Sequence, residues 1–194
     1  MKNTLLTMTI LLSAFVAEAA QINWGSKGAL YDGTTIMSKA NGYSTTAYLV
    51  YLGSAGATWD SFDVVSFAST KSDENVVAGP KNANDYGVVV ATASPYAVTV
   101  GAPVGGGTDV LTDGSSTFGV LYLATGGSFG ENTYYVTGDE FVYDTTSENY
   151  KAGTSTLTAQ SSVPSGTTWT AVPEPSTAAL ALAGLALLLK RRKA

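Results

Sequence analysis

The chain has 194 residues, with 15 acidic and 10 basic side chains, and it contains neither cysteine nor histidine. Without cysteine there are no disulfides or thiolate metal sites, and without histidine there are no Ser-His-Asp triads, Cys-His pairs or HExxH zinc sites. These absences argue against a hydrolase, so we expect a protein that is not an enzyme and that uses no cofactor.

The N-terminus has the layout of a secretory signal peptide. Lys2 gives a positive charge, an apolar run follows over Leu5–Val16, and Ala17-Glu18-Ala19 fits the small-x-small rule for cleavage. We expect residues 1–19 to be a signal peptide that is cleaved after Ala19, with Ala17 and Ala19 as the small residues of the cleavage site. A retained N-terminal anchor is the alternative, although the run is short for one.

The next part of the chain, residues 20–160, has the pattern of a β-rich domain. Aromatic and β-branched runs alternate with Gly, Asn and Asp, which is typical of strands and turns. This predicts an all-β fold, as a single β-sandwich or jelly-roll-like domain. The expected strands are Tyr43–Leu52, Phe62–Phe67, Tyr86–Thr92, Tyr96–Val100, Phe118–Ala124, Thr133–Thr137, Glu140–Tyr143, Ser155–Gln160 and Thr167–Val172.

Two kinds of local irregularity are expected within this domain. Gly138-Asp139 separates two of the strands and fits a hairpin turn. Thr35–Ala40 and Ser54–Phe62 have the least strand-like composition, so either stretch is a candidate for a short helical turn.

After the domain, residues 161–172 are rich in Ser, Thr, Gly and Pro, and we expect them to form a spacer. Five of the ten cations and two of the fifteen acids lie in the end segments 1–19 and 173–194, so the body carries a charge of about −8. Nucleic acid is a poor partner for such a surface, because phosphate binding relies on clustered Lys and Arg.

Acidic residues form two candidate sites in the body. Asp109, Asp113 and Gly114 lie in a Gly-rich loop, where carboxylates could bind calcium, but the spacing matches no EF-hand and solvated turn residues are the simpler interpretation. A second group could supply a carboxylate pair for glycoside hydrolysis, although neighbouring acids are common on exposed strands without any catalysis. This second group consists of Asp139, Glu140 and Asp144.

Aromatic residues form a third candidate site. Trp24, Trp59 and Trp169, together with eleven tyrosines, could provide a platform on which sugar rings stack. Core packing is the simpler interpretation for most of these side chains.

The C-terminus combines three elements in one order. Pro173-Glu174-Pro175 is followed by an apolar run, Ala178–Leu189, and then by Lys190-Arg191-Arg192-Lys193. The run is shorter than the ~20 residues of a typical membrane span, but local thinning and snorkelling can close the gap. The four cations favour the cytoplasmic side, so we expect a short hydrophobic helix in the inner membrane with the body outside. A buried C-terminal helix is the alternative.

This tail resembles the PEP-CTERM sorting signal of exported proteins of Gram-negative bacteria, and the resemblance is confined to residues 173–194. It implies recognition of Pro173, Glu174 and Pro175 by a membrane-embedded exosortase, which processes the chain near the motif. It also implies a transient stay in the inner membrane, with Lys190, Arg191, Arg192 and Lys193 as the basic stop. Delivery to the cell surface or to the extracellular polysaccharide matrix would follow.

Two functions therefore remain open for the body. The first is a structural or interaction role at the cell surface or in the extracellular matrix. The second is a carbohydrate-binding or calcium-dependent lectin-like module that is delivered by the same route.

Overall fold

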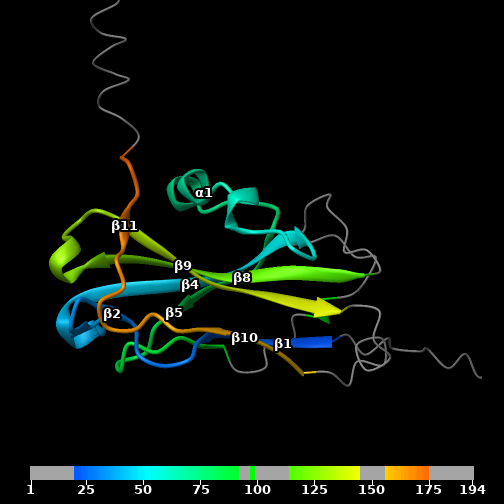
Figure 1. Cartoon of the computed structure of the whole chain (residues 1–194). Coiled ribbons are helices and arrows are strands. Elements are labelled where there is room, and N and C mark those ends of the chain that lie inside the picture. Colours follow the sequence, from blue (N-terminus) through cyan, green and yellow to red (C-terminus); the bar gives the residue numbers. More distant parts are fainter. Residues whose placement is uncertain (1–19, 92–96, 99–113, 145–155, 175–194) are drawn as a thin grey trace, which may run out of the picture.

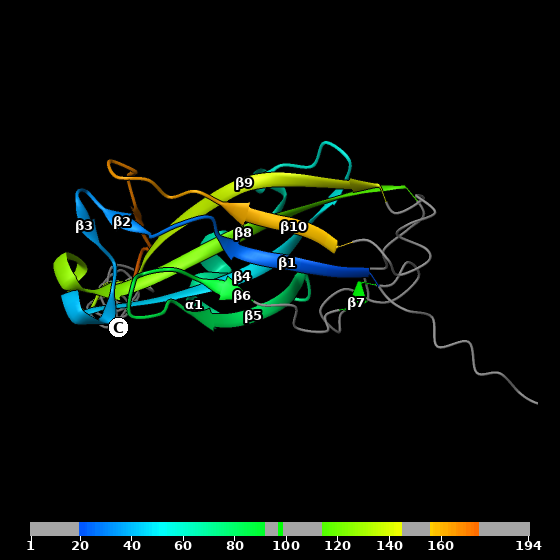
Figure 2. The same cartoon turned by 90° about the horizontal axis from the view of Figure 1, so that it is seen from below.

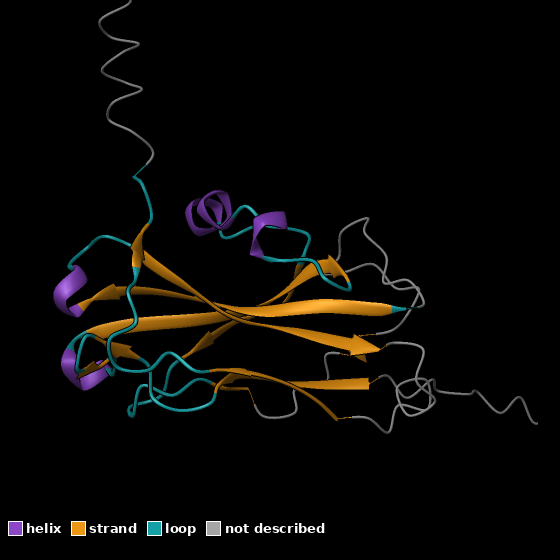
Figure 3. Cartoon of the chain, viewed as in Figure 1, coloured by secondary structure: helices purple, strands orange, loops and turns teal. Residues whose placement is uncertain are grey.

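The structure is a computed structural model of the chain, and it describes residues 20–91, 97–98, 114–144 and 156–174. Two β-sheets face each other, and a short helix lies on the far side of the larger sheet (Figures 1 and 3). The elements in chain order are β1 (Ala20–Ser26), β2 (Tyr31–Asp32), β3 (Thr35–Ile36), η1 (Lys39–Asn41), β4 (Tyr43–Ser54), η2 (Trp59–Ser61), α1 (Val64–Thr70), β5 (Val76–Asn82), β6 (Val90–Ala91), β7 (Ala97–Val98), β8 (Ser115–Gly126), η3 (Gly127–Phe129), β9 (Tyr134–Asp144), β10 (Thr156–Ser161) and β11 (Thr170–Ala171).

The larger sheet has five strands in the order β11-β9-β8-β4-β5, and every neighbouring pair is antiparallel. The smaller sheet has the order β10-β1-β6, with β7 also paired to β1, and it lies across the larger sheet in Figure 2. Within it, β1 and β10 are parallel, from Gln21 opposite Thr156 to Ser26 opposite Ser161. This parallel pair departs from the purely antiparallel order of a jelly roll. A separate hairpin joins β2 to β3.

An apolar core fills the space between the two sheets, and we call it the inner cluster. Trp24 from β1 and Phe118 and Tyr122 from β8 are each at most 1% exposed. The hydroxyl of Tyr122 donates a hydrogen bond to the carbonyl of Gly25 at 2.6 Å, which ties the two sheets together. Burial, with a smaller contribution from Asp139, raises the pKa of Tyr122. The buried members are Ile22, Trp24, Leu30, Met37, Tyr43, Ala47, Leu49, Ala78, Val89, Ala91, Phe118, Val120, Tyr122, Ala124, Phe129, Ala159, Val163 and Trp169.

A second, smaller core lies between the five-stranded sheet and α1, and we call it the outer cluster. Phe67 of α1 meets the ring of Tyr48 edge-on, with 4.9 Å between the ring centroids. The helix starts where the side chain of Asp63 accepts a hydrogen bond from the Ser66 amide at 2.9 Å, which caps the first turn. The buried members are Tyr48, Val50, Leu52, Phe62, Val64, Phe67, Ala68, Leu121 and Leu123.

Strand β8 contributes to both clusters, because successive side chains point to opposite faces of a sheet. Phe118, Val120 and Tyr122 face the inner cluster, whereas Leu121 and Leu123 face the outer one. Covering on both faces explains why the strand is buried almost without interruption. The same pattern allowed Phe118–Ala124 to be predicted as a strand.

The prediction of a β-rich body is confirmed, and β4, β8 and β10 lie where strands were expected. Short helical turns also occur in the two stretches proposed for them, as η1 and η2. The expected strand Phe62–Phe67 is wrong: helix α1 begins at Val64, because Asp63 supplies an N-cap and the helix buries Phe67 against the sheet.

The expected hairpin at Gly138-Asp139 is also wrong, because both residues lie inside the continuous strand β9. Gly138 is required there by packing rather than by a turn. A Cβ atom at this position would lie 2.1 Å from the Ser161 hydroxyl of β10. The Ser161 hydroxyl accepts a hydrogen bond from the Asp139 amide at 2.8 Å.

The structure differs from the prediction in two further ways: some strands are shorter than predicted, and others were not predicted at all. In the described part of the expected strand Tyr86–Thr92, residues 86–91, only Val90–Ala91 is a strand, β6, because residues 84–87 form a tight turn. Strands β1 and β5 were not predicted. Both segments contain glycine, and β5 also contains Pro80, residues that weaken a strand pattern in sequence.

Candidate functional site

The segment after β10 leads to the sorting motif, and it is packed against the body. Val163 and Trp169 are 3% and 7% exposed, and the Trp169 indole donates a hydrogen bond to the carbonyl of Tyr31 at 2.8 Å. The Trp169 ring also contacts Phe129, with 5.8 Å between the ring centroids. Residues 161–172, which we expected to form a spacer, are thus packed against the body at Val163 and Trp169. Their Ser, Thr, Gly and Pro content suggested a linker, but two apolar side chains anchor the segment in the core.

The motif begins directly where this packed segment ends. Strand β11 pairs with the start of β9, and the amide of Val172 donates to the carbonyl of Thr133 at 2.8 Å. Val172 also packs against the outer cluster. The next two residues, Pro173 and Glu174, are exposed. The first two motif residues are thus exposed to solvent directly after the hydrogen bond of Val172 to Thr133.

The remaining residues of the sorting signal lie outside the described part of the chain. These are Pro175, the apolar run Ala178–Leu189 and the basic stop Lys190, Arg191, Arg192 and Lys193. The proposed cleavage site at Ala17 and Ala19 lies outside it as well. Over the residues that the structure does describe, none of the helices has the length and apolarity that crossing a membrane requires.

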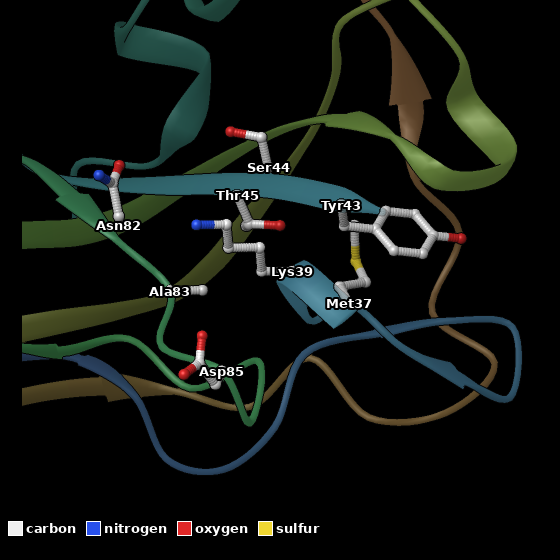
Figure 4. Close-up of a pocket in the computed structure, with 8 residues that line it drawn as sticks. All are labelled: Met37, Lys39, Tyr43, Ser44, Thr45, Asn82, Ala83 and Asp85. Carbon is white, nitrogen blue, oxygen red and sulfur yellow. The ribbon is translucent and has the colours of Figure 1, made fainter. Parts of the chain in front are cut away.

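A pocket of about 420 Å³ opens beside the start of β4 (Figure 4). Its base includes Met37 and Tyr43, which are 1% and 6% exposed, and its rim carries exposed polar side chains of both charges. In the close-up, Lys39 and Asp85 lie on the same side of β4. The lining residues are Met37, Lys39, Tyr43, Ser44, Thr45, Asn82, Ala83 and Asp85.

One polar group of the pocket wall lacks a partner. Thr45 is 4% exposed, and its Oγ1 atom is buried without a hydrogen bond to any atom of the described residues. Its backbone carbonyl, in contrast, accepts from the amide of Ala83 at 2.9 Å, which joins the two sides of the pocket. A buried hydroxyl without a partner is uncommon in native proteins, and it often marks a place where water or a ligand binds.

The turn next to the pocket is held by hydrogen bonds that centre on Asn84. The side-chain oxygen of Asn84 accepts from the amides of Tyr86 and Val88, at 2.9 and 3.0 Å. The backbone of Asn84 also bonds to Gly87 and Val88, at 2.9 Å each. Gly87 packs against the preceding segment so closely that a Cβ atom would lie 2.9 Å from Ile36. The turn therefore has a fixed shape, and it displays Asp85 and Tyr86 to solvent.

The acidic candidates lie elsewhere. Asp139, Glu140 and Asp144 are all on β9 and all exposed, and Glu140 accepts a hydrogen bond from the Trp59 amide at 3.4 Å. Val142, between Glu140 and Asp144, is 55% exposed, so this face of β9 is open to solvent.

The candidate calcium residues Asp109 and Asp113 lie outside the described part of the chain, and Gly114 is its first residue after that gap. Across the described segments, no three Asp or Glu side chains come close enough to hold a metal ion.

The structure does not support a sugar-stacking platform built from Trp24 and Trp169. Trp24 is 1% exposed and Trp169 is 7% exposed, so both rings are core residues. Trp59 covers Gly119 on the outer face of the sheet and donates its indole N–H to the carbonyl of Gly138 at 2.8 Å. Among the described aromatic residues the most exposed ring is instead that of Tyr86, at 78% exposure, which the sequence pattern had placed at the start of a strand. The signal that could have found it is Asn84 and Gly87 on either side, which are typical turn residues.

Comparison with known proteins identifies the tail. Residues 171–193 match the family described as the PEP-CTERM protein-sorting motif. Neither a curated protein nor a solved structure matches the chain. The motif implies that the protein is exported, processed by an exosortase and sorted to the cell envelope or surface. The match covers the tail alone and does not describe what the body does there.

Proposed function

We propose that the protein is a non-catalytic surface protein of a Gram-negative bacterium, in which the tail directs delivery and a β-sandwich body has a structural or interaction role. The observation that carries this proposal is the match of residues 171–193 to the sorting motif. The exposure of Pro173 and Glu174 directly after the packed residue Val172 supports it, because the motif is open to a protease while the body stays folded.

The proposed order of events uses both ends of the chain. Cleavage after Ala19 would release a body whose first strand, β1, starts at Ala20, so every described strand would survive the cut. The run Ala178–Leu189 and the basic stop would then hold the chain briefly in the inner membrane. Processing near Pro173-Glu174-Pro175 would pass the body, residues 20–172, to the cell surface or the extracellular polysaccharide matrix.

Proline makes the motif a suitable protease substrate. It fixes its own φ near −65° and disfavours helical geometry in the residue before it. Pro175 therefore biases Glu174 towards an extended conformation, which fits an active-site groove.

The variant Glu174→Ala tests recognition in cells that contain an exosortase. We expect the uncut chain to accumulate in the inner membrane, as measured by immunoblotting of membrane and released fractions. Glu131→Ala is the matched control, because Glu131 is an exposed glutamate of the body, and its processing should be normal. Normal processing of Glu174→Ala, with normal retention in a strain without exosortase, would contradict the role of this side chain.

Cleavage of the signal peptide after Ala19 can be tested separately. Sequencing of the surface-delivered protein should begin at Ala20. Recovery of a delivered protein that still begins at Met1 would refute signal-peptide cleavage without affecting the proposal for the tail.

A further inference from the structure

We propose that the pocket beside β4 binds a neutral, polyhydroxylated ligand, namely one sugar unit of a polysaccharide. The inference rests on the proposed surface role of the body and names the ligand class for it. It is carried by the pocket, by the fixed turn at Asn84 and by the exposed ring of Tyr86.

The size and lining of the pocket fit a small polar molecule. Its volume of about 420 Å³ falls within the range of known small-molecule sites, roughly 300–1,000 Å³. Ligand pockets combine an apolar base with a few polar groups that fix orientation. Here the buried residues Met37 and Tyr43 belong to the lining, and the exposed side chains of Lys39, Asn82 and Asp85 supply polar groups.

The charges of the rim favour a neutral ligand. Lys39 offers donors only, Asp85 offers acceptors only, and Asn82 offers both, so together they match hydroxyl groups, which donate and accept. A metal ion would find one carboxylate in the pocket, and an anion would find one lysine beside that carboxylate. The charge of about −8 on the body further disfavours acidic polymers.

The turn at Asn84 provides the second part of the site. Its hydrogen bonds fix the backbone from Asn84 to Val88, and the amide of Leu30 donates to the carbonyl of Gly87 at 2.9 Å. Preorganised loops hold binding side chains in place at little entropic cost on binding. The two side chains that this turn displays are Asp85, which lines the pocket, and Tyr86, which follows it.

Tyr86 supplies the apolar surface that a sugar requires. Its ring is 78% exposed, so it adds little to the core, and the hydrogen bond that Tyr86 donates to the Asn84 side chain comes from its backbone amide. The C–H face of a pyranose packs on an aromatic face, while its hydroxyls bond to neighbouring polar groups. An exposed ring on a fixed turn, one residue after Asp85 of the pocket lining, offers such a face to a sugar that occupies the pocket.

Binding can be measured on the full chain, purified in a detergent without a sugar headgroup. The probes are two neutral polysaccharides, dextran and galactomannan, and one acidic polysaccharide, alginate, in affinity electrophoresis and titration calorimetry. We expect at least one neutral polymer to bind. Tyr86→Ala should weaken that binding about three- to tenfold, and Asp85→Asn about tenfold.

Two control variants distinguish loss of contacts in the pocket from a general effect of changing an exposed residue. Asp60→Asn removes a carboxylate from exposed η2, and Val142→Ala trims an exposed side chain of β9, and both should bind as the unaltered chain does. Equal melting temperatures for all four variants would show that the fold is intact.

Absence of binding to both neutral polymers, preference for alginate, or full binding by Tyr86→Ala and Asp85→Asn would overturn the inference. Processing of the tail in cells is read separately. A chain that is processed normally but binds no neutral sugar refutes the pocket assignment alone.

Discussion

The two faces of the five-stranded sheet are buried by different kinds of contact. The inner cluster draws its residues from almost the whole described chain, from Ile22 to Trp169. The outer cluster takes all but Leu121 and Leu123 from residues 48–68, a single continuous segment. Contacts between distant segments require the whole fold, whereas local contacts can open and close separately. We therefore expect the inner cluster to set global stability and the outer cluster to open locally.

The largest effect is expected from Phe118→Ala. Phe118 is 1% exposed in the inner cluster, and truncation of a buried phenylalanine costs about 3–5 kcal/mol. Denaturant unfolding of the full chain should show one cooperative transition with a much lower midpoint. A loss below about 1 kcal/mol, similar to that of the exposed control Val142→Ala, would show that the inner cluster does not set stability.

A smaller effect is expected from Gly119→Ala, which tests the outer face. The new Cβ atom would lie 2.3 Å from Cζ2 of Trp59, so the indole must leave the sheet and lose its bond to Gly138. We expect a cost of about 1–3 kcal/mol and a red-shifted tryptophan emission.

A double-mutant cycle with Trp59→Ala isolates this contact. Because the truncated side chain no longer meets residue 119, the effect of Gly119→Ala should largely vanish in that background. Strictly additive losses would contradict the steric explanation.

Tyr122→Phe removes the hydrogen bond between the sheets and should cost about 1–2 kcal/mol, since the carbonyl of Gly25 loses its partner. The pKa of Tyr122 is raised by burial, so its contribution to stability is full below the ordinary tyrosine pKa of about 10 and is lost as the pH rises above it. The melting temperature of the unaltered chain should therefore fall more steeply above pH 10 than that of Tyr122→Phe. Parallel curves for the two proteins would refute the assignment.

The smallest effect is expected from Asp63→Ala, which removes the N-cap of α1 and should cost about 1 kcal/mol. Hydrogen exchange should accelerate in α1 while the amides of β8 keep their protection. Asp60→Ala is the control, because no side-chain cap bond forms at η2. Equal acceleration in β8 would mean that the two clusters open together.

The strands that sequence predicted well are those whose burial dominates their environment. β8 is covered on both faces and β4 pairs on both edges, so their apolar content was a sufficient signal. The prediction failed where tertiary contacts decide the local structure. Asp63 turns an apolar run into a helix, and Ser161 accounts for Gly138 within a strand.

The two candidate sites differ in the same way. The sorting motif is a contiguous stretch, so Pro173, Glu174 and Pro175 could be found from sequence alone. The pocket could not, because its lining comes from residues 37–45 and 82–85, which are joined by the pairing of β4 with β5. Tyr86 belonged to an apolar run that looked like a strand, and the flanking turn residues Asn84 and Gly87 were a weaker signal than the run itself.

The position of β1 has a consequence for how the protein crosses a membrane. This strand is the first to emerge when the chain is threaded from its N-terminus, yet its parallel partner β10 is formed by residues 156–161. The smaller sheet is complete only after nearly all of the body has passed through, because its central strand needs one of the last strands as a partner. We therefore expect the last step of folding, the docking of β10 beside β1, to take place only on the far side of the membrane.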